Sequence, residues 1–201
     1  MKKRLADLGQ PVISVDSKKK ELIGNFKNPG TVWSKEYDSV FAHAFRSMAV
    51  GIARPYGIYD QMTNNGTVVV GTSYDTPAFA VDSIESWLVS YGWHQYPHMK
   101  QLLILCDSGG SNSYRARAWK YGLYSKICRV YGISITVCHY PPGASKWNPV
   151  DHQLFSFISI NWARKPLRSY EIMLNYIRNT TTQHGLEVDA ILNETKYEKG
   201  I

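Results

Sequence analysis

Three aspartates lie at the ends of expected strands and helices, and their positions point to metal chemistry. Asp16 closes the apolar, β-branched run that starts at Pro11, and Asp107 closes the apolar run that starts at Gln101. Acids at the carboxyl ends of sheet strands lie where α/β folds bind ligands. Neighbouring carboxylates repel each other unless a cation neutralises them, and oxygen-only ligand sets suit Mg²⁺ or Mn²⁺. With Asp151, they could hold two such ions about 4 Å apart, an arrangement used for in-line attack on a phosphodiester.

Each acid also has a structural alternative. Asp16 stands before Ser-Lys-Lys and Asp107 before Ser-Gly-Gly, so either could simply start a turn. If Asn148 caps the next helix and Pro149 is its first residue, Asp151 lies at the third helical position. A carboxylate there favours the helix dipole and resembles a capping box. The pattern alone leaves these alternatives open.

The positive charge is concentrated in one part of the chain. The formal net charge is +7, from 23 Lys and Arg against 16 Asp and Glu. Residues 108–178 hold ten basic and two acidic residues, which makes that stretch +8 and the remainder −1. Aromatic residues are interspersed among these basic ones, the footprint of a polyanion-binding surface. Solvated basic helix faces are the alternative interpretation.

The elements that would position the acids can be predicted from periodicity and turn residues. The expected order is strands, helix, strand, helix, strand, helix and helix, which predicts one α/β domain with a mixed sheet and helices on its faces. Residues 31–54 lack a clear pattern and are interpreted as an inserted loop. Residues 20–26 are expected to pair back onto the first strand. The expected strands cover 11–16, 56–61, 67–71, 101–107, 133–138 and 186–192, and the expected helices cover 76–92, 114–131, 148–162 and 169–179.

Composition excludes several protein classes. With 44% hydrophobic and 19% charged residues, the chain is neither disordered nor fibrous. Its longest purely apolar run, 102–106, is far shorter than the roughly 20 residues that span a bilayer. The three cysteines have no CxxC spacing, which favours a reduced chain in the cytoplasm without disulfides or structural zinc.

Several motifs together resemble those of a known family. The segment 140–151, Tyr-Pro-Pro-Gly-Ala-Ser-Lys-Trp-Asn-Pro-Val-Asp, resembles the stretch before the third acid of DDE transposases. There, a Pro-Pro pair is followed by Asn-Pro, Ile or Val, and then Glu or Asp. The segments 14–28, 55–60, 107–112 and 152–159 resemble motifs of the Rhodopirellula-type DDE transposases of bacterial insertion sequences. The resemblance covers nearly the whole chain from about Gly9.

The resemblance implies a ribonuclease H-like catalytic core, expected over 1–182, and a C-terminal tail over 183–201. Asp16, Asp107 and Asp151 would bind two Mg²⁺ or Mn²⁺ ions. The domain would then nick transposon ends and join the freed 3′-hydroxyl to target DNA. The implied partners are double-stranded DNA (transposon ends and target) and a second copy or a full-length transposase, with no membrane. The expected location is the bacterial cytoplasm, at the nucleoid.

The DNA contacts expected from the charge pattern and the resemblance lie around the acids. The basic residues would hold phosphates. Asn112 would orient a ligand or DNA near the metal ions. The expected DNA-binding residues are Lys18, Lys19, Lys20, Asn112, Arg115, Arg117, Lys120 and Lys146.

Two departures from the family pattern bear on activity. The third acid is usually Glu, and the shorter arm of Asp151 would draw the carboxylate back from the metal and reduce activity. Family members carry a helix-turn-helix region before the first catalytic strand, whereas Met1 lies 15 positions before Asp16. The chain is therefore expected to be a truncated core. The alternatives are an inactive DNA-binding remnant and another ribonuclease H-like nuclease.

Overall fold

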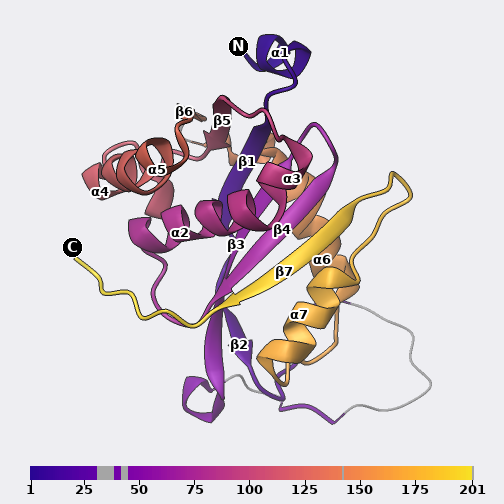
Figure 1. Cartoon of the computed structure of the whole chain (residues 1–201). Coiled ribbons are helices and arrows are strands. Elements are labelled where there is room, and N and C mark those ends of the chain that lie inside the picture. Colours follow the sequence, from indigo (N-terminus) through magenta and orange to yellow (C-terminus); the bar gives the residue numbers. More distant parts are fainter. Residues whose placement is uncertain (31–38, 42–44, 142, 201) are drawn as a thin grey trace.

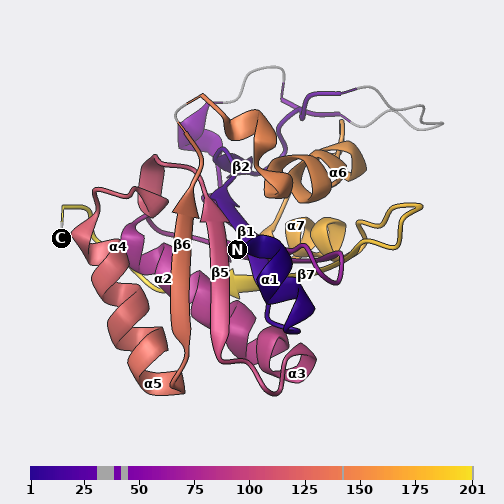
Figure 2. The same cartoon turned by 90° about the horizontal axis from the view of Figure 1, so that it is seen from above.

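The computed structural model describes residues 1–30, 39–41, 45–141 and 143–200. The described residues contain a seven-stranded mixed sheet in the order β6-β5-β1-β3-β4-β7, with β2 paired to β3. Helices cover both faces of this sheet (Figures 1 and 2). The strands are β1 (Val12–Ser17), β2 (Glu21–Ile23), β3 (Gly51–Asp60), β4 (Asn65–Gly71), β5 (Gln101–Cys106), β6 (Ser134–His139) and β7 (Glu187–Asn193).

The helices include three stretches of wider, π-helical winding. One face of the sheet carries α2 to α5, and the other carries α6 and α7 (Figure 1). The α-helices are α1 (Lys2–Asp7), α2 (Pro77–Trp87), α3 (Trp93–Gln95), α4 (Arg117–Gly122), α5 (Arg129–Tyr131), α6 (Ser156–Asn161) and α7 (Tyr170–Arg178). The π-helical turns are Leu88–Gly92, Leu123–Cys128 and Asp151–Phe155, and short 3₁₀ turns lie at Arg46–Met48, Gly110–Asn112 and Ser145–Trp147.

The sheet separates two apolar cores, and the alternation of side chains along its strands explains why. In β4, Val69 belongs to the core under α2, while Val68 and Val70 belong to the core under α6 and α7. Successive side chains of a strand point to opposite faces. Because both faces are covered, the central strands are continuously apolar rather than alternating.

Local sequence signals set several of the element boundaries. Asn64 adopts a positive φ of 55° in the β3–β4 turn, as the Asn-Asn-Gly signal predicts. Thr76 caps α2 by accepting a hydrogen bond from the Phe79 amide at 3.2 Å, and Pro77 takes the first helical position. Gly132, with φ 67°, ends the helix that starts at Arg117.

Two predictions need correction, and a third falls partly outside the described residues. The strand β2 pairs with β3 and not with β1, because both edges of β1 are occupied by β3 and β5. Gly92 keeps a helical φ of −55°, so the α2 helix continues beyond it into α3. Residues 31–38 and 42–44 of the expected loop at 31–54 lie outside the described residues, and its last four residues, from Gly51, begin β3.

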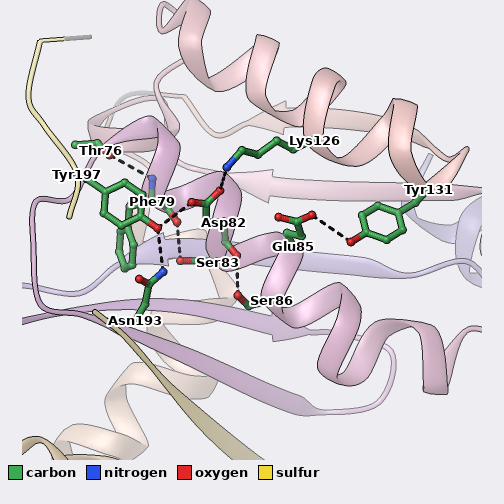
Figure 3. Close-up of polar contacts among 10 residues, drawn as sticks. All are labelled: Thr76, Phe79, Asp82, Ser83, Glu85, Ser86, Lys126, Tyr131, Asn193 and Tyr197. Atoms are coloured by element: carbon green, nitrogen blue, oxygen red, sulfur yellow. Dashed lines mark hydrogen bonds and ion pairs between the residues drawn. The ribbon is translucent and has the colours of Figure 1, made fainter. Parts of the chain in front are cut away.

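The segment expected to be a C-terminal tail contains a strand of the sheet. Residues Glu187–Asn193 form β7, which runs parallel to β4 at the sheet edge. Beyond β7, the chain returns across α2, where Tyr197 is buried and its hydroxyl donates to Asp82 Oδ2 at 2.9 Å (Figure 3). Asp82 also forms an ion pair with Lys126, and Tyr131 donates to Glu85 at 3.1 Å. These contacts tie α2 to its neighbours.

Every helix in the described part of the chain is too short or too polar to cross a bilayer.

Candidate active site

Two of the predicted acids leave the sheet side by side. The parallel strands β1 and β5 pair so that Val15 lies opposite Cys106. The next residues, Asp16 and Asp107, therefore follow at the same carboxyl edge. Both parent strands are central in the sheet, which gives these acids a rigid base.

Asp151 reaches this edge from a helix that packs closely on the sheet. It is the first residue of the π-helical turn Asp151–Phe155, which continues into α6. The turn packs over Gly57, which lies opposite Asp16 in the β1–β3 register. A Cβ at Gly57 would come within 2.5 Å of the Phe155 ring and 3.0 Å of Val150. The absence of a side chain at Gly57 thus lets the Asp151 helix approach the strand that carries Asp16.

The three acids share one electrostatic environment. Burial raises the pKa of Asp16 to about 7, against the opposing effect of a 2.7 Å hydrogen bond from the Ser17 amide. The charges of Asp151 and Asp107 raise this pKa further. Burial also raises the pKa of Asp107 and of Asp151, and the charge of Asp107 adds to the effect on Asp151. Their negative charges therefore destabilise one another unless a cation is present.

The donor set fits a hard divalent cation. Asp107 Oδ1 is buried and has no hydrogen-bond partner among the described residues. A buried oxygen left unpaired is costly unless a ligand completes it. Among the described residues, no group of three or more His, Cys, Asp or Glu side chains is placed so that it could hold a metal ion as it stands. The three acids thus lie close enough for their charges to repel one another, but not in an arrangement that already binds a metal ion.

A fourth acid, Asp75, was missed by the sequence analysis. It lies in the loop before α2, next to the capping residue Thr76. Its Oδ1 is buried and finds no hydrogen-bond partner among the described residues, and its charge also raises the pKa of Asp16. In the sequence, an acid before a capped helix start has no distinguishing feature, so only the fold reveals its proximity to Asp16.

Asn112 is placed differently from the expectation that it orients a ligand or DNA. Its side chain is only 2% exposed, and its Oδ1 accepts a 2.8 Å hydrogen bond from the buried Tyr56 hydroxyl. Its backbone carbonyl contacts His139 Nε2 at 2.8 Å. These contacts fasten the loop after Asp107 to β3 and β6 and leave almost none of the side chain exposed for DNA.

A family model described as the Rhodopirellula transposase DDE domain matches residues 1–201. The chain belongs to this family. No curated protein sequence matches it significantly.

Solved structures with a similar fold are Mos1 transposase complexes. A paired-end complex with left transposon end has 17% identity and a TM-score of 0.55, covering 84% of this chain and 46% of that chain. A Strand Transfer Complex has 16% identity and a TM-score of 0.55, covering 87% and 48%. A pre-cleavage transpososome has 14% identity and a TM-score of 0.53, covering 84% and 48%. The transposase domain therefore has the expected ribonuclease H-like fold and spans less than half the length of these chains.

The predicted DNA-binding lysines of the transposase domain differ in availability. Lys18 forms a 2.9 Å ion pair with Glu21, and its side chain is only 11% exposed. Its ammonium also lies 5.1 Å from the centre of the Trp162 ring. Lys18 is thus held inside the domain, whereas Lys19 and Lys20 are exposed.

The other predicted basic residues of the transposase domain are on its surface. Arg115, Arg117, Lys120 and Lys146 are all exposed. The Arg115 guanidinium lies over the Tyr114 ring at 5.3 Å, and Lys146 lies over Trp147 at 5.4 Å. These two pairs occur in the chain just after Asp107 and just before Asp151, so they belong to the segments that flank the acids.

Proposed function

We propose that this transposase domain cleaves DNA strands at transposon ends and transfers the freed 3′ ends to target DNA. The observation that carries the proposal is that Asp16, Asp107 and Asp151 lie near one edge of the sheet and raise one another's pKa. Each comes from a different element, and Asp107 keeps a buried oxygen without a partner in the described part of the chain. A cation bound at such a site would favour the ionised form of all three acids.

We assign these three aspartates as ligands of two Mg²⁺ or Mn²⁺ ions. When bound, the ions would activate the attacking oxygen and stabilise charge on the phosphate. The protein's own part is to place the three carboxylates near one another in a partly desolvated position. Because Asp16 has a pKa of about 7 without a cation, metal and proton compete for its carboxylate.

Exposed cations around the acids would bind the DNA backbone. Lys19, Lys20, Arg115, Arg117, Lys120 and Lys146 are free of the inward ion pair that holds Lys18. Tyr114 and Trp147, 45% and 65% exposed, offer rings on which unstacked bases could pack. The Mos1 structures include a complex with transposon-end DNA, which supports transposon ends as the partner. We further propose that the domain acts paired with a second copy or with a full-length transposase.

The test is metal-dependent nicking and strand transfer on DNA carrying the element's own ends. The wild-type domain should act with Mg²⁺ or Mn²⁺ and stop when EDTA is added. Asp107→Ala should abolish both steps, while Asp189→Asn, an exposed acid distant in sequence, serves as the matched control. Salt-sensitive DNA binding without cleavage would instead identify an inactive remnant. Preferential cutting of junctions or RNA–DNA hybrids would identify another nuclease.

A further inference from the structure

A buried polar contact joins the two segments that carry Asp16 and Asp151. Ser14 and Asn148, 134 positions apart, are both 0% exposed. The Ser14 hydroxyl donates to Asn148 Oδ1 and accepts from the Val150 amide at 3.2 Å. Asn148 Nδ2 in turn approaches the Val15 carbonyl at 3.5 Å. We call this group of contacts the Ser14–Asn148 tie.

The tie lies within three residues of each acid. Ser14 precedes Asp16 by two positions on β1, so both side chains point to the same face of the sheet. Ile13 and Val15 point to the opposite face, into the core under α2. On the other segment, the Asp151 amide donates to the Asn148 carbonyl at 3.1 Å.

The chemistry of the tie favours a positioning role over a stabilising one. A buried hydroxyl and a buried amide are costly unless partnered, and their net contribution to stability is small even when they are. Hydrogen bonds are nevertheless directional, so they specify one placement of the two segments where apolar packing would tolerate several. Asn148 directly precedes the helical residues Pro149 and Val150, but its Oδ1 accepts from the Ser14 hydroxyl of β1 instead of from an amide of its own helix.

We propose that Ser14 and Asn148 are positioning residues that set the separation of the Asp16 and Asp151 carboxylates. This inference rests on the proposed metal-binding function. Aspartate has a shorter arm than glutamate, so a metal shared with Asp16 requires the helix backbone to lie closer to β1. The Ser14–Asn148 tie holds the Asp151 segment close to β1, and the missing side chain of Gly57 leaves room for that close approach.

The experiment compares two isosteric variants, Ser14→Thr and Ser14→Val. Both add the same bulk to the strand, and only Thr keeps the hydroxyl. We expect Ser14→Val to raise the half-saturating Mn²⁺ concentration for DNA cleavage by about 10- to 100-fold, the usual effect of losing a contact behind the metal ligands. Ser14→Thr should stay near wild type, and excess Mn²⁺ should partly restore Ser14→Val.

A matched control separates positioning from a general loss of stability. Ser83 is also 0% exposed and donates its hydroxyl to the Phe79 carbonyl at 2.7 Å, but it lies on α2 across the sheet. Ser83→Ala should shift the unfolding midpoint without changing the Mn²⁺ dependence. If Ser14→Val fails to fold, Ser14→Ala removes the hydroxyl without added volume and replaces it in every comparison.

Two further measurements do not depend on DNA cleavage. Mn²⁺ binding to the protein alone, followed by electron paramagnetic resonance, should weaken in Ser14→Val and not in Ser14→Thr. Hydrogen exchange without metal should lose protection at the Val150 and Asp151 amides in Ser14→Val alone. Equal protection and equal Mn²⁺ dependence in the two variants would overturn the positioning role. A wild-type domain that neither binds Mn²⁺ nor cleaves DNA would refute the proposed function instead, and hydrogen exchange would still decide whether the tie holds the Asp151 segment.

Discussion

The two ends of the central sheet both hold aspartates with buried oxygen atoms, but these oxygens differ in their hydrogen-bond partners. At the end opposite the candidate site, Asp60 is 0% exposed and lies across from Ile13 of β1. Its Oδ2 accepts a 2.7 Å hydrogen bond from Tyr96, and its Oδ1 accepts one of 2.9 Å from the Met62 amide. At the carboxyl edge of β5, by contrast, Asp107 Oδ1 has no partner among the described residues.

This difference separates a structural acid from acids available to a ligand. Burial raises the pKa at both ends, so a raised pKa alone does not identify the site. The hydrogen-bond partners do identify the site, because both carboxylate oxygens of Asp60 accept hydrogen bonds from the protein itself. Asp107 and Asp75 each retain a buried oxygen to which no described residue donates a hydrogen bond.

The largest expected effect is loss of cleavage in Asp107→Ala. Removing one metal ligand should lower the rate by about a thousandfold or more, since bound metal contributes several kcal/mol to the transition state. The unfolding midpoint should not fall, because an unpartnered, partly desolvated carboxylate is removed. Paired cleavage assays and thermal unfolding without metal measure both quantities. Cleavage that survives in Asp107→Ala would show that Asp107 is not a ligand needed for catalysis.

The opposite pattern is expected for Asp60→Ala. This change leaves the Tyr96 hydroxyl and the Met62 amide without their acceptor, at a cost of about 2 kcal/mol in the free energy of unfolding. Urea unfolding measures that cost, and cleavage by the folded fraction should match wild type. Stability that is retained while cleavage falls would show that Asp60 belongs to the site.

The partners of the basic side chains likewise distinguish structural cations from cations available to DNA. Lys146 is exposed, whereas Lys18 is paired with Glu21 inside the domain. We expect Lys146→Ala to reduce the slope of log affinity against log salt concentration by about one, the contribution of one phosphate contact. Lys18→Ala should leave the slope unchanged, although it lowers stability. Fluorescence anisotropy over a range of salt concentrations measures this, and equal slopes for Lys146→Ala and wild type would remove Lys146 from the interface.

The smallest expected effect is on the pH dependence of stability. Burial raises the pKa of Asp60 above its ordinary value of 3.8, so the folded state holds this proton to higher pH than the unfolded state does. The contribution of Asp60 is therefore most favourable below that ordinary value and declines as pH rises through the folded-state pKa. Asp60→Asn should lessen the fall in the urea midpoint between acidic and neutral pH. An unchanged pH profile would contradict the assignment of this shift to Asp60.

Local chemistry accounts for what the sequence predicted correctly. The cap at Thr76, the left-handed turn at Asn64 and the apolar strand before Asp107 depend on residues close in the chain. The strand patterns also predicted that Asp16 and Asp107 lie at the carboxyl edge of the sheet. Together with the family resemblance, these signals predicted the ribonuclease H-like fold.

What the sequence could not predict depends on contacts between distant segments. Asn148 was expected to cap its own helix, yet its carboxamide bonds to Ser14. The strand β2 was expected on β1, whose edges are taken by other strands. The proximity of Asp75 to Asp16 exists only once α2 is packed on the sheet. No pattern of neighbouring residues encodes these three arrangements.

We propose above all that the acids at the carboxyl edge of β1 and β5 bind divalent cations. Titration of Mn²⁺ into wild-type protein, Asp107→Asn and Asp60→Asn, followed by electron paramagnetic resonance, tests it most directly. We expect wild type and Asp60→Asn to bind Mn²⁺ with similar affinity, and Asp107→Asn to bind at least tenfold more weakly. Equal affinity in Asp107→Asn and wild type would contradict the claim.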